Sequence, residues 1–298
     1  MRMSKSKFVF LSMAGALGLL IVAWFIGRTY YRKPSDKART LTIKYDFTVS
    51  NPTSRAINGV ELLAGTPLPT TATQHCRKNS TNQPSRAIQD DAGNTHLQFH
   101  WALIPPYTTK VVSIASEVDV WQQPRSSKSS PASVYLAPEP FIESDHALIT
   151  KRAHDLKAKN DRETAQNCFD WVVENIRYAG YVKKNRGALY ALKHRNGDCT
   201  ELATLFVALC RADGVPARYL GGFVASKSAV LGLGDYHNWA EFYYKGRWHL
   251  ADPQQKIFMN DKAASAYIAY KIIQPSEGIE DALLTNIKGA GLKVKASR

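Results

Sequence analysis

The chain has 298 residues, of which 44% are hydrophobic, and a formal net charge of +14. This length and apolar content exclude a wholly disordered chain and suffice for one large or two modest domains. Of the net charge, +7 lies in residues 1–39 and +4 in residues 285–298, which leaves about +3 for residues 40–284. Nucleic-acid-binding proteins usually carry their charge on the folded body, so we expect no nucleic acid partner and favour anionic lipid or an envelope polymer.

Residues 8–27, FVFLSMAGALGLLIVAWFIG, contain no charged side chain. About 20 apolar residues span a bilayer as a helix, whereas the core of a secretory signal is usually roughly 7–15 residues long and precedes small residues at a cleavage site. Trp24, Phe25 and Ile26 stand where that site would fall. We therefore predict a single N-terminal transmembrane helix with a basic flank in residues 1–39, with cleavage as the alternative.

The charges around this span do not settle its orientation. Three basic residues precede it and five follow it before residue 40, and this count would keep the second flank inside the cell. A single N-terminal anchor is nevertheless the common way to tether an exported domain. We expect a membrane-anchored protein whose folded part is periplasmic or otherwise extracytoplasmic.

Residues 40–121 have the pattern of β-strands. Apolar residues alternate with polar ones from Leu41 to Val49, and Asn58-Gly59 supplies a turn. Two further runs, HLQFHWALI and KVVSIASEVDVW, read as strands of the same kind. We predict a small antiparallel β-sandwich, followed by a Ser- and Pro-rich linker at residues 122–134.

The pattern changes to helical spacing within residues 135–273. Helices are predicted over residues 142–159, 163–176 and 200–212, and strands over residues 217–225, 237–244 and 247–252. Helices followed by strands indicate an α+β fold and not a parallel sheet with crossover helices. Residues 274–298 are expected to form a basic C-terminal tail.

Cys199 stands at the first turn of the third predicted helix, directly after Asp198, which can cap that helix as can Asn196. The free N–H groups and the positive end of the helix dipole favour a thiolate at this position. The same N–H groups can stabilise an oxyanion on an attacked carbonyl. We interpret Cys199 as a nucleophile, and a small buried residue is the alternative.

A nucleophilic thiol needs a base, and the base needs a group that orients it. His237 begins one predicted strand and Asp252 ends the next, and antiparallel neighbours bring such positions together. His249 is a rival base, but it lies mid-strand beside Trp248, where a core or surface role is more natural. We expect no cofactor and no metal, because the histidines and cysteines lack a ligand pattern.

The segments GDCTELATLFVALCRADGVPARYLGGF, HNWAEFYY and WHLADP together resemble the transglutaminase-like superfamily. The resemblance covers about residues 135–273 and implies a papain-like core whose triad is Cys199, His237 and Asp252. It implies acyl transfer: the cysteine attacks a peptide or protein amide, forms a thioester, and releases the acyl group to water or to an amine. Residues 40–121 resemble the N-terminal domain of many bacterial members.

Hydrolysis is slightly favoured over crosslinking, because no organised amine site is evident. The alternative is a non-catalytic module that binds envelope peptides or partner proteins in the same cleft. The substrate is expected to be a peptide or protein. A basic cluster before Cys199 indicates either an acidic substrate or merely a solvated face; its members are Lys183, Lys184, Arg186, Lys193, His194 and Arg195. The oligomeric state is open.

No second oxyanion donor can be placed; the candidates are Asn185, Tyr190 and Asn196. Cys168 and Cys210 form either a disulfide or two buried thiols.

Overall fold

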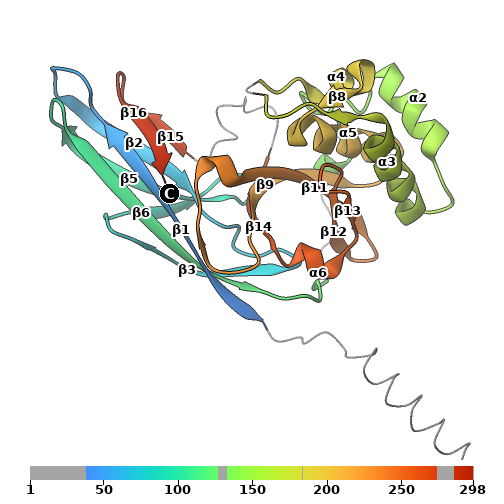
Figure 1. The fold of residues 1–298 in the computed structure, drawn as a ribbon, viewed down its shortest axis with the longest axis horizontal. Coiled ribbons are helices and arrows are strands. Elements are labelled where there is room, and N and C mark those ends of the chain that lie inside the picture. Colours follow the sequence, from blue (N-terminus) through green and yellow to red (C-terminus); the bar gives the residue numbers. More distant parts are fainter. Residues whose placement is uncertain (1–37, 127–132, 183, 274–284, 298) are drawn as a thin grey trace, which may run out of the picture. The chain divides into compact units, whose positions relative to one another are not determined.

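The computed structural model describes residues 38–126, 133–182, 184–273 and 285–297 (Figure 1). The predicted transmembrane helix at residues 8–27 lies outside these ranges, so the anchor stays a prediction. No helix within the described ranges is long and apolar enough to cross a membrane.

The N-terminal part forms two antiparallel sheets around a shared apolar core. One sheet has the order β3-β6-β1, and the other has the order β2-β5-β4. The alternation predicted from Leu41 to Val49 is confirmed, because every second side chain of β1 is buried. The strands are β1 Arg39–Ser50, β2 Ile57–Gly65, β3 Gln74–Thr81, β4 Arg86–Gln89, β5 Thr95–Ile104 and β6 Thr109–Val120.

The segment expected as a basic tail contains two strands in its described part. β15 (Thr285–Lys288) pairs with β2, and β16 (Lys293–Ser297) pairs with β1. In β16 the apolar Val294 and Ala296 pack against the sandwich core, alternating with lysines. The charge of this segment suggested a tail, whereas the alternation of its lysines with apolar residues is that of a strand with one buried face.

The C-terminal part packs helices against one face of a third antiparallel sheet, whose order is β13-β12-β11-β9-β14. The helix α5 is the central helix of this part, where it contacts the helices α2, α3 and α4 and the strands β9 and β11. These elements are α2 Ala147–Leu156, α3 Asp161–Asn175, α4 Gly187–His194, α5 Cys199–Ala212, α6 Asp261–Ala264, β9 Ala217–Val224, β11 Tyr236–Tyr244, β12 Arg247–Asp252, β13 Ile257–Phe258 and β14 Tyr267–Ile272. Short pieces complete the chain: β7 Arg177–Tyr178, β8 Asn196–Gly197, β10 Ala229–Val230, and the 3₁₀ helices Ser133–Tyr135 and Leu233–Asp235.

Local sequence signals explain how the central elements begin and end. Asp198 caps α5, and its capping box with Glu201 satisfies amide groups of the first turn. Lys245 and Gly246 both have positive φ, as the two-residue turn of a β11–β12 hairpin requires. The helix predicted over 142–159 is shorter than expected, because Ile142 forms a β-bridge with Glu139 before α2 begins.

The sandwich and the helix-covered sheet share buried surface. Phe223, Ile268 and Tyr270, from β9 and β14, belong to the same apolar cluster as the sandwich strands. Two buried amides join the parts by polar contacts: Gln74 bonds to the backbone of Ala269, and Asn94 bonds to the backbone of Ile272. Each amide therefore fixes β14 to the sandwich through paired hydrogen bonds.

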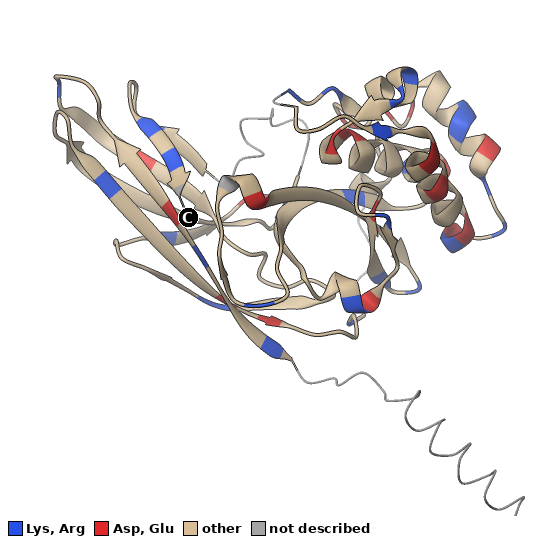
Figure 2. Ribbon diagram, viewed as in Figure 1, with Lys and Arg blue, Asp and Glu red and all other residues tan. Residues whose placement is uncertain are grey.

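Lys, Arg, Asp and Glu are interspersed along the described elements, and charges of both signs lie on α2 and α3 (Figure 2). On α2, Lys151 and Arg152 form ion pairs with Asp155. This mixture agrees with the nearly neutral balance that the sequence gives for residues 40–284.

Candidate active site

The structure brings Cys199, His237 and Asp252 together. Cys199 is the first residue of α5, His237 is near the start of β11, and Asp252 ends the neighbouring strand β12. His237 Nε2 lies 2.6 Å from Asp252 Oδ2. The His237 ring is also in hydrogen-bonding contact with Cys199, which leaves Nδ1 as the ring nitrogen available to the thiol. The three side chains thus form one chain of contacts in the order predicted from the sequence.

The charge state of His237 follows from these neighbours. Burial alone would lower the pKa of His237, but its hydrogen bonds to Asp252 and Cys199 outweigh burial and raise the pKa to about 9. The imidazole therefore keeps its proton at neutral pH and faces the Cys199 sulfur as a cation. The rings of Trp239 and Tyr267 pack around His237 and hold its plane.

The carboxyl group of Asp252 is fully buried and accepts three hydrogen bonds. Besides the bond to His237, Oδ2 accepts from the Tyr267 hydroxyl at 2.7 Å, and Oδ1 accepts from the Gln255 N–H at 3.0 Å. Tyr267 lies on β14, and burial raises its pKa, so the hydroxyl stays protonated as a donor. The sequence analysis missed Tyr267, because no motif connects a tyrosine of one strand to a carboxylate that it meets only in the folded sheet.

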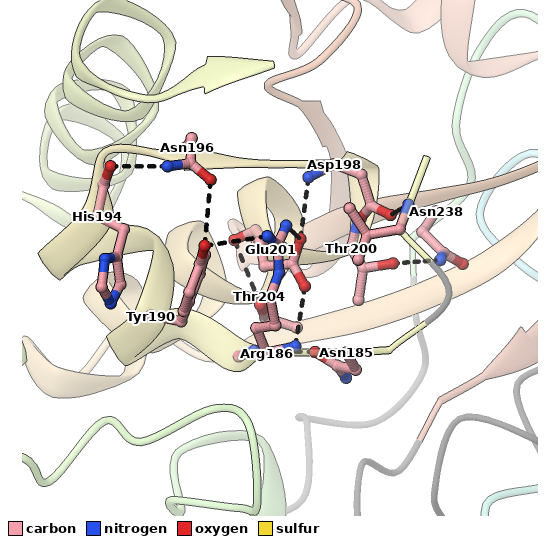
Figure 3. A network of polar contacts seen from close by, with 12 residues as sticks. Asn185, Arg186, Tyr190, His194, Asn196, Asp198, Thr200, Glu201, Thr204 and Asn238 are labelled. Carbon is pink, nitrogen blue, oxygen red and sulfur yellow. Dashed lines mark hydrogen bonds and ion pairs between the residues drawn. The ribbon is translucent and has the colours of Figure 1, made fainter. Parts of the chain in front are cut away.

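A network of polar contacts fixes the start of α5 (Figure 3). Asp198 Oδ1 accepts from the Thr200 N–H, and the buried Glu201 accepts from the Asp198 N–H at 2.9 Å. Arg186 donates to Glu201 twice, through its backbone N–H and through Nη2 at 2.8 Å. Asn238, one residue after His237, donates to the Thr200 hydroxyl. The nucleophile and its base are thereby held to one framework.

The cap leaves one useful amide free. The N–H groups of Thr200 and Glu201 are taken by the Asp198 side chain, and that of Leu202 bonds to the Asp198 carbonyl. Within the described ranges, the Cys199 N–H has no such partner. This amide is therefore placed to donate to an oxygen on a carbon attacked by the Cys199 sulfur.

A pocket of about 1010 Å³ opens beside the triad. Cys199 and His237 line it, together with the exposed residues Tyr178, Tyr181 and Val224. None of its described lining residues is a lysine or an arginine, whereas Asp198 and Asp235 are among them. Its volume suits several residues of a peptide and far exceeds a single water or ion site.

The rival base and the three candidate oxyanion donors that the sequence offered do not take part in the triad or its pocket. His249 is buried, where its Nε2 bonds to the Tyr244 carbonyl and burial lowers its pKa, so it is a neutral core histidine. The three candidates for an oxyanion donor do not line the pocket. Tyr190 and Asn196 bond to each other and Asn185 accepts from the Gly187 N–H, within the network of Figure 3.

Two members of the basic cluster before Cys199 have structural contacts. Arg186 pairs with Glu201 and lies over the Tyr190 ring, and Arg195 lies over the Trp171 ring. Both guanidinium groups thus interact with residues of the fold itself. These contacts favour neither of the two interpretations of the cluster, a solvated face or a site for an acidic substrate.

The remaining cysteines are free thiols. Cys168 and Cys210 are fully buried and in contact with each other across α3 and α5, and burial raises the pKa of Cys210. Burial also raises the pKa of Cys76 in the sandwich. Cys199 therefore differs from all three in facing both a histidine and a pocket.

Comparisons with known proteins identify a family profile and solved structures that are similar to this chain. The profile of the transglutaminase-like superfamily matches residues 150–253, which include all three triad positions. A structure from Cytophaga hutchinsonii, described as a candidate cysteine protease, has 19% identity and a TM-score of 0.57, covering 88% of this chain and 92% of that one. The periplasmic domain of TgpA from Pseudomonas aeruginosa has 18% identity and a TM-score of 0.40, covering 72% of this chain and 90% of that one. No curated protein sequence matches the chain.

The resemblance to the transglutaminase-like superfamily is therefore confirmed, and residues 150–253 form a transglutaminase-like core. The likeness to the Cytophaga structure extends to the fold of most of the chain. Proteins with this core are typically cysteine proteases or transglutaminases.

Proposed function

We propose that this protein is a cysteine-dependent acyl-transfer enzyme that acts on amide bonds of peptides or proteins. The observation that carries the proposal is the contact chain from Asp252 through His237 to Cys199, with its 2.6 Å bond, at the wall of a large pocket. A module that only binds peptides would have no need for a thiol paired with a buried histidine and carboxylate.

In the acylation step, the Cys199 thiolate attacks the amide carbon, and a C–S bond forms while the carbonyl oxygen becomes an oxyanion. The Cys199 N–H at the start of α5 donates to this oxyanion. As the C–N bond breaks, the His237 imidazolium gives its proton to the leaving amine. Asp252 holds the ring orientation and stabilises the charged imidazole throughout.

In the deacylation step, neutral His237 accepts a proton from water as the water oxygen bonds to the thioester carbon. The C–S bond then breaks and releases a carboxylic acid, which restores the thiolate and imidazolium pair. An amine in place of water would give a crosslinked amide by the same sequence of bonds. We favour hydrolysis, because water needs no dedicated acceptor site.

The pocket bears on the substrate. Its described lining includes Asp198 and Asp235 but no lysine or arginine, and the His237 imidazolium is already paired with Asp252. An acidic side chain next to the reacting amide would therefore meet two carboxylates and no unpaired cation among these residues. We therefore propose neutral or basic peptide segments over acidic ones. Together with the apolar span of residues 8–27, we propose a membrane-anchored enzyme that acts on peptides or proteins of the cell envelope.

The test is a product analysis. The full-length chain is incubated with a peptide library, with and without a primary amine acceptor, and the products are identified by mass. We expect new carboxyl termini or deamidated side chains that are absent with Cys199→Ala. Amine adducts formed in preference to hydrolysis would reassign the reaction to crosslinking, and binding of peptides without any Cys199-dependent product would support the non-catalytic alternative.

A further inference from the structure

An oxyanion at Cys199 needs more than one hydrogen-bond donor, and the Cys199 N–H supplies only one. Five tyrosines lie near the thiol or line its pocket: Tyr178, Tyr181, Tyr219, Tyr236 and Tyr267. A second donor must satisfy three conditions: its hydroxyl must be near Cys199, must be reachable from the pocket, and must not already be bonded within the protein.

Three of these tyrosines fail one of the conditions. The Tyr267 hydroxyl donates to Asp252. Tyr219 is buried and bonds to the Thr200 side chain. The Tyr236 hydroxyl is completely covered, in a space that exists because residue 221 is glycine: a Cβ there would overlap it. A covered oxygen cannot touch a substrate.

Tyr178 meets all three conditions. It lines the pocket and is 47% exposed, so a substrate can reach it. Within the described part of the chain its hydroxyl has no hydrogen-bond partner. Tyr178 lines the same pocket as Cys199 and pairs with Gly197, two residues before it, so the phenol lies on the side of the thiol. Burial raises the pKa of Tyr178, which keeps the hydroxyl protonated as a donor.

The backbone fixes Tyr178 in this place. It pairs with Gly197 in the two-stranded β7–β8 sheet, and its neighbours on both sides bond to the segment that leads into α5. The Arg177 N–H donates to the Arg195 carbonyl at 3.0 Å, and the Ala179 N–H donates to the Gly197 carbonyl at 2.8 Å. Tyr181 is 80% exposed and lies beyond the paired segment.

We propose that the Tyr178 hydroxyl is the second donor to the oxyanion that forms at Cys199, opposite the Cys199 backbone N–H. This inference rests on the proposed function, because it assigns the tyrosine to an intermediate that exists only if Cys199 attacks a carbonyl. During attack the phenol O–H shares its proton with the developing oxyanion and keeps it when the carbonyl reforms, so no net proton transfer takes place.

The test compares two reactions of the same thiol in the full-length chain. Acylation by p-nitrophenyl acetate passes through an oxyanion, whereas alkylation by iodoacetamide displaces iodide at a saturated carbon and forms none. We expect Tyr178→Phe to slow acylation by on the order of 10- to 100-fold, since loss of one donor in other enzymes costs about 100-fold or more. Alkylation should change by less than about twofold. Tyr236→Phe should slow acylation less than Tyr178→Phe does. The control Tyr107→Phe, at an exposed tyrosine that does not line the pocket, should leave both rates close to wild type.

Each other outcome has a separate meaning. Unchanged acylation in Tyr178→Phe, or an equal slowing of both reactions, would overturn the assignment, because the residue would then act on no oxyanion or on the thiol itself. A larger effect from Tyr236→Phe would move the role to that residue. Acylation that persists in Cys199→Ala would overturn the proposed nucleophile, and this inference with it.

Discussion

At the scale of single residues, the four cysteines differ in what surrounds their sulfur atoms. Cys168 and Cys210 are fully buried, and burial raises the pKa of the Cys76 thiol. Cys199 instead contacts His237, which keeps its proton up to about pH 9. A cysteine reacts with electrophiles as the thiolate, so accessibility and an imidazolium partner decide the rate.

We expect iodoacetamide at pH 6 to modify Cys199 first in the native chain, at least about tenfold faster than the other three cysteines. His237→Ala should slow this reaction, because the imidazolium partner is lost. Asp252→Ala should slow it less, because the carboxylate acts through the histidine. Rates are measured by quenching at intervals and mapping the modified peptides by mass. Equal modification of all four cysteines would show that Cys199 is a structural thiol.

The raised pKa of His237 gives a second prediction at this scale. A histidine whose folded pKa is raised to about 9 stabilises the folded state at pH values below about 6.5, and this contribution is lost as the pH rises through about 9. The same deprotonation removes the acid that the leaving amine needs. Peptide cleavage should therefore decline above pH 9 in wild type.

The pKa can be measured directly by NMR of histidines labelled at the ring carbon, with His237→Asn assigning the signal. We expect a midpoint near 9 in wild type and a lower one in Asp252→Asn, which removes a hydrogen bond that raises it. A midpoint near 6.5 in both proteins would show that the contacts with Asp252 and Cys199 do not persist in solution.

At the scale of elements, the start of α5 depends on a buried charge. The Glu201 side chain is almost fully buried. Its carboxylate forms an ion pair with the Arg186 guanidinium and accepts hydrogen bonds from the backbone N–H groups of Arg186 and Asp198. Removing one partner of a buried pair leaves the other charge unpaired, which usually costs about 3–5 kcal/mol. Because Arg186 remains partly exposed, water can solvate part of the site after its removal.

We expect Arg186→Ala to lower the free energy of unfolding by about 3 kcal/mol in urea denaturation of the full-length chain. It should also slow alkylation of Cys199, because the cap that orients the first turn is loosened. Arg162→Ala, at an exposed position of α3, is the matched control and should change the unfolding free energy by less than about 0.5 kcal/mol. Equal effects of the two variants would mean that the Arg186–Glu201 pair adds nothing to this helix start.

The elements that local signals define were predictable, and those that depend on distant contacts were not. Asp198 before an apolar run predicted α5. The two strands predicted over residues 237–244 and 247–252 formed the hairpin that carries His237 and Asp252, and its turn is Lys245–Gly246. The helix α4 was missed, because the segment before Cys199 was assessed only for its basic residues, two of which, Lys193 and His194, belong to the helix. Tyr267 reaches Asp252 only through the pairing of β14 with β9, which no local pattern encodes.

At the scale of the described chain, β14 connects the sandwich to the triad. Gln74 donates to the carbonyls of Leu68 and Ala269 and accepts from the Ala269 N–H. Two residues earlier on the same strand, Tyr267 donates to Asp252. The sandwich therefore helps to hold the strand that orients the triad carboxylate, and the two parts share one apolar cluster.

Gln74→Met keeps the approximate volume but removes the acceptor of the Ala269 N–H and the donor to the Leu68 and Ala269 carbonyls. We expect a loss of about 2 kcal/mol in unfolding free energy, because buried polar groups left without partners cost roughly 1–3 kcal/mol. Gln123→Met, at an exposed position, is the control and should be neutral. A neutral effect of Gln74→Met in thermal and urea unfolding would show that the sandwich does not depend on this contact with β14.

A covalent acyl intermediate on Cys199 is the step that distinguishes an acyl-transfer enzyme from a protein that only binds peptides. The most direct measurement is the intact mass of the full-length protein within seconds of mixing with a peptidyl p-nitrophenyl ester, followed by mapping of the modified peptide. We predict an added mass equal to the acyl group, located on Cys199, that decays as water resolves the thioester and is absent in Cys199→Ala. An adduct on another residue, or turnover of the ester without any adduct and undiminished in Cys199→Ala, would contradict the claim.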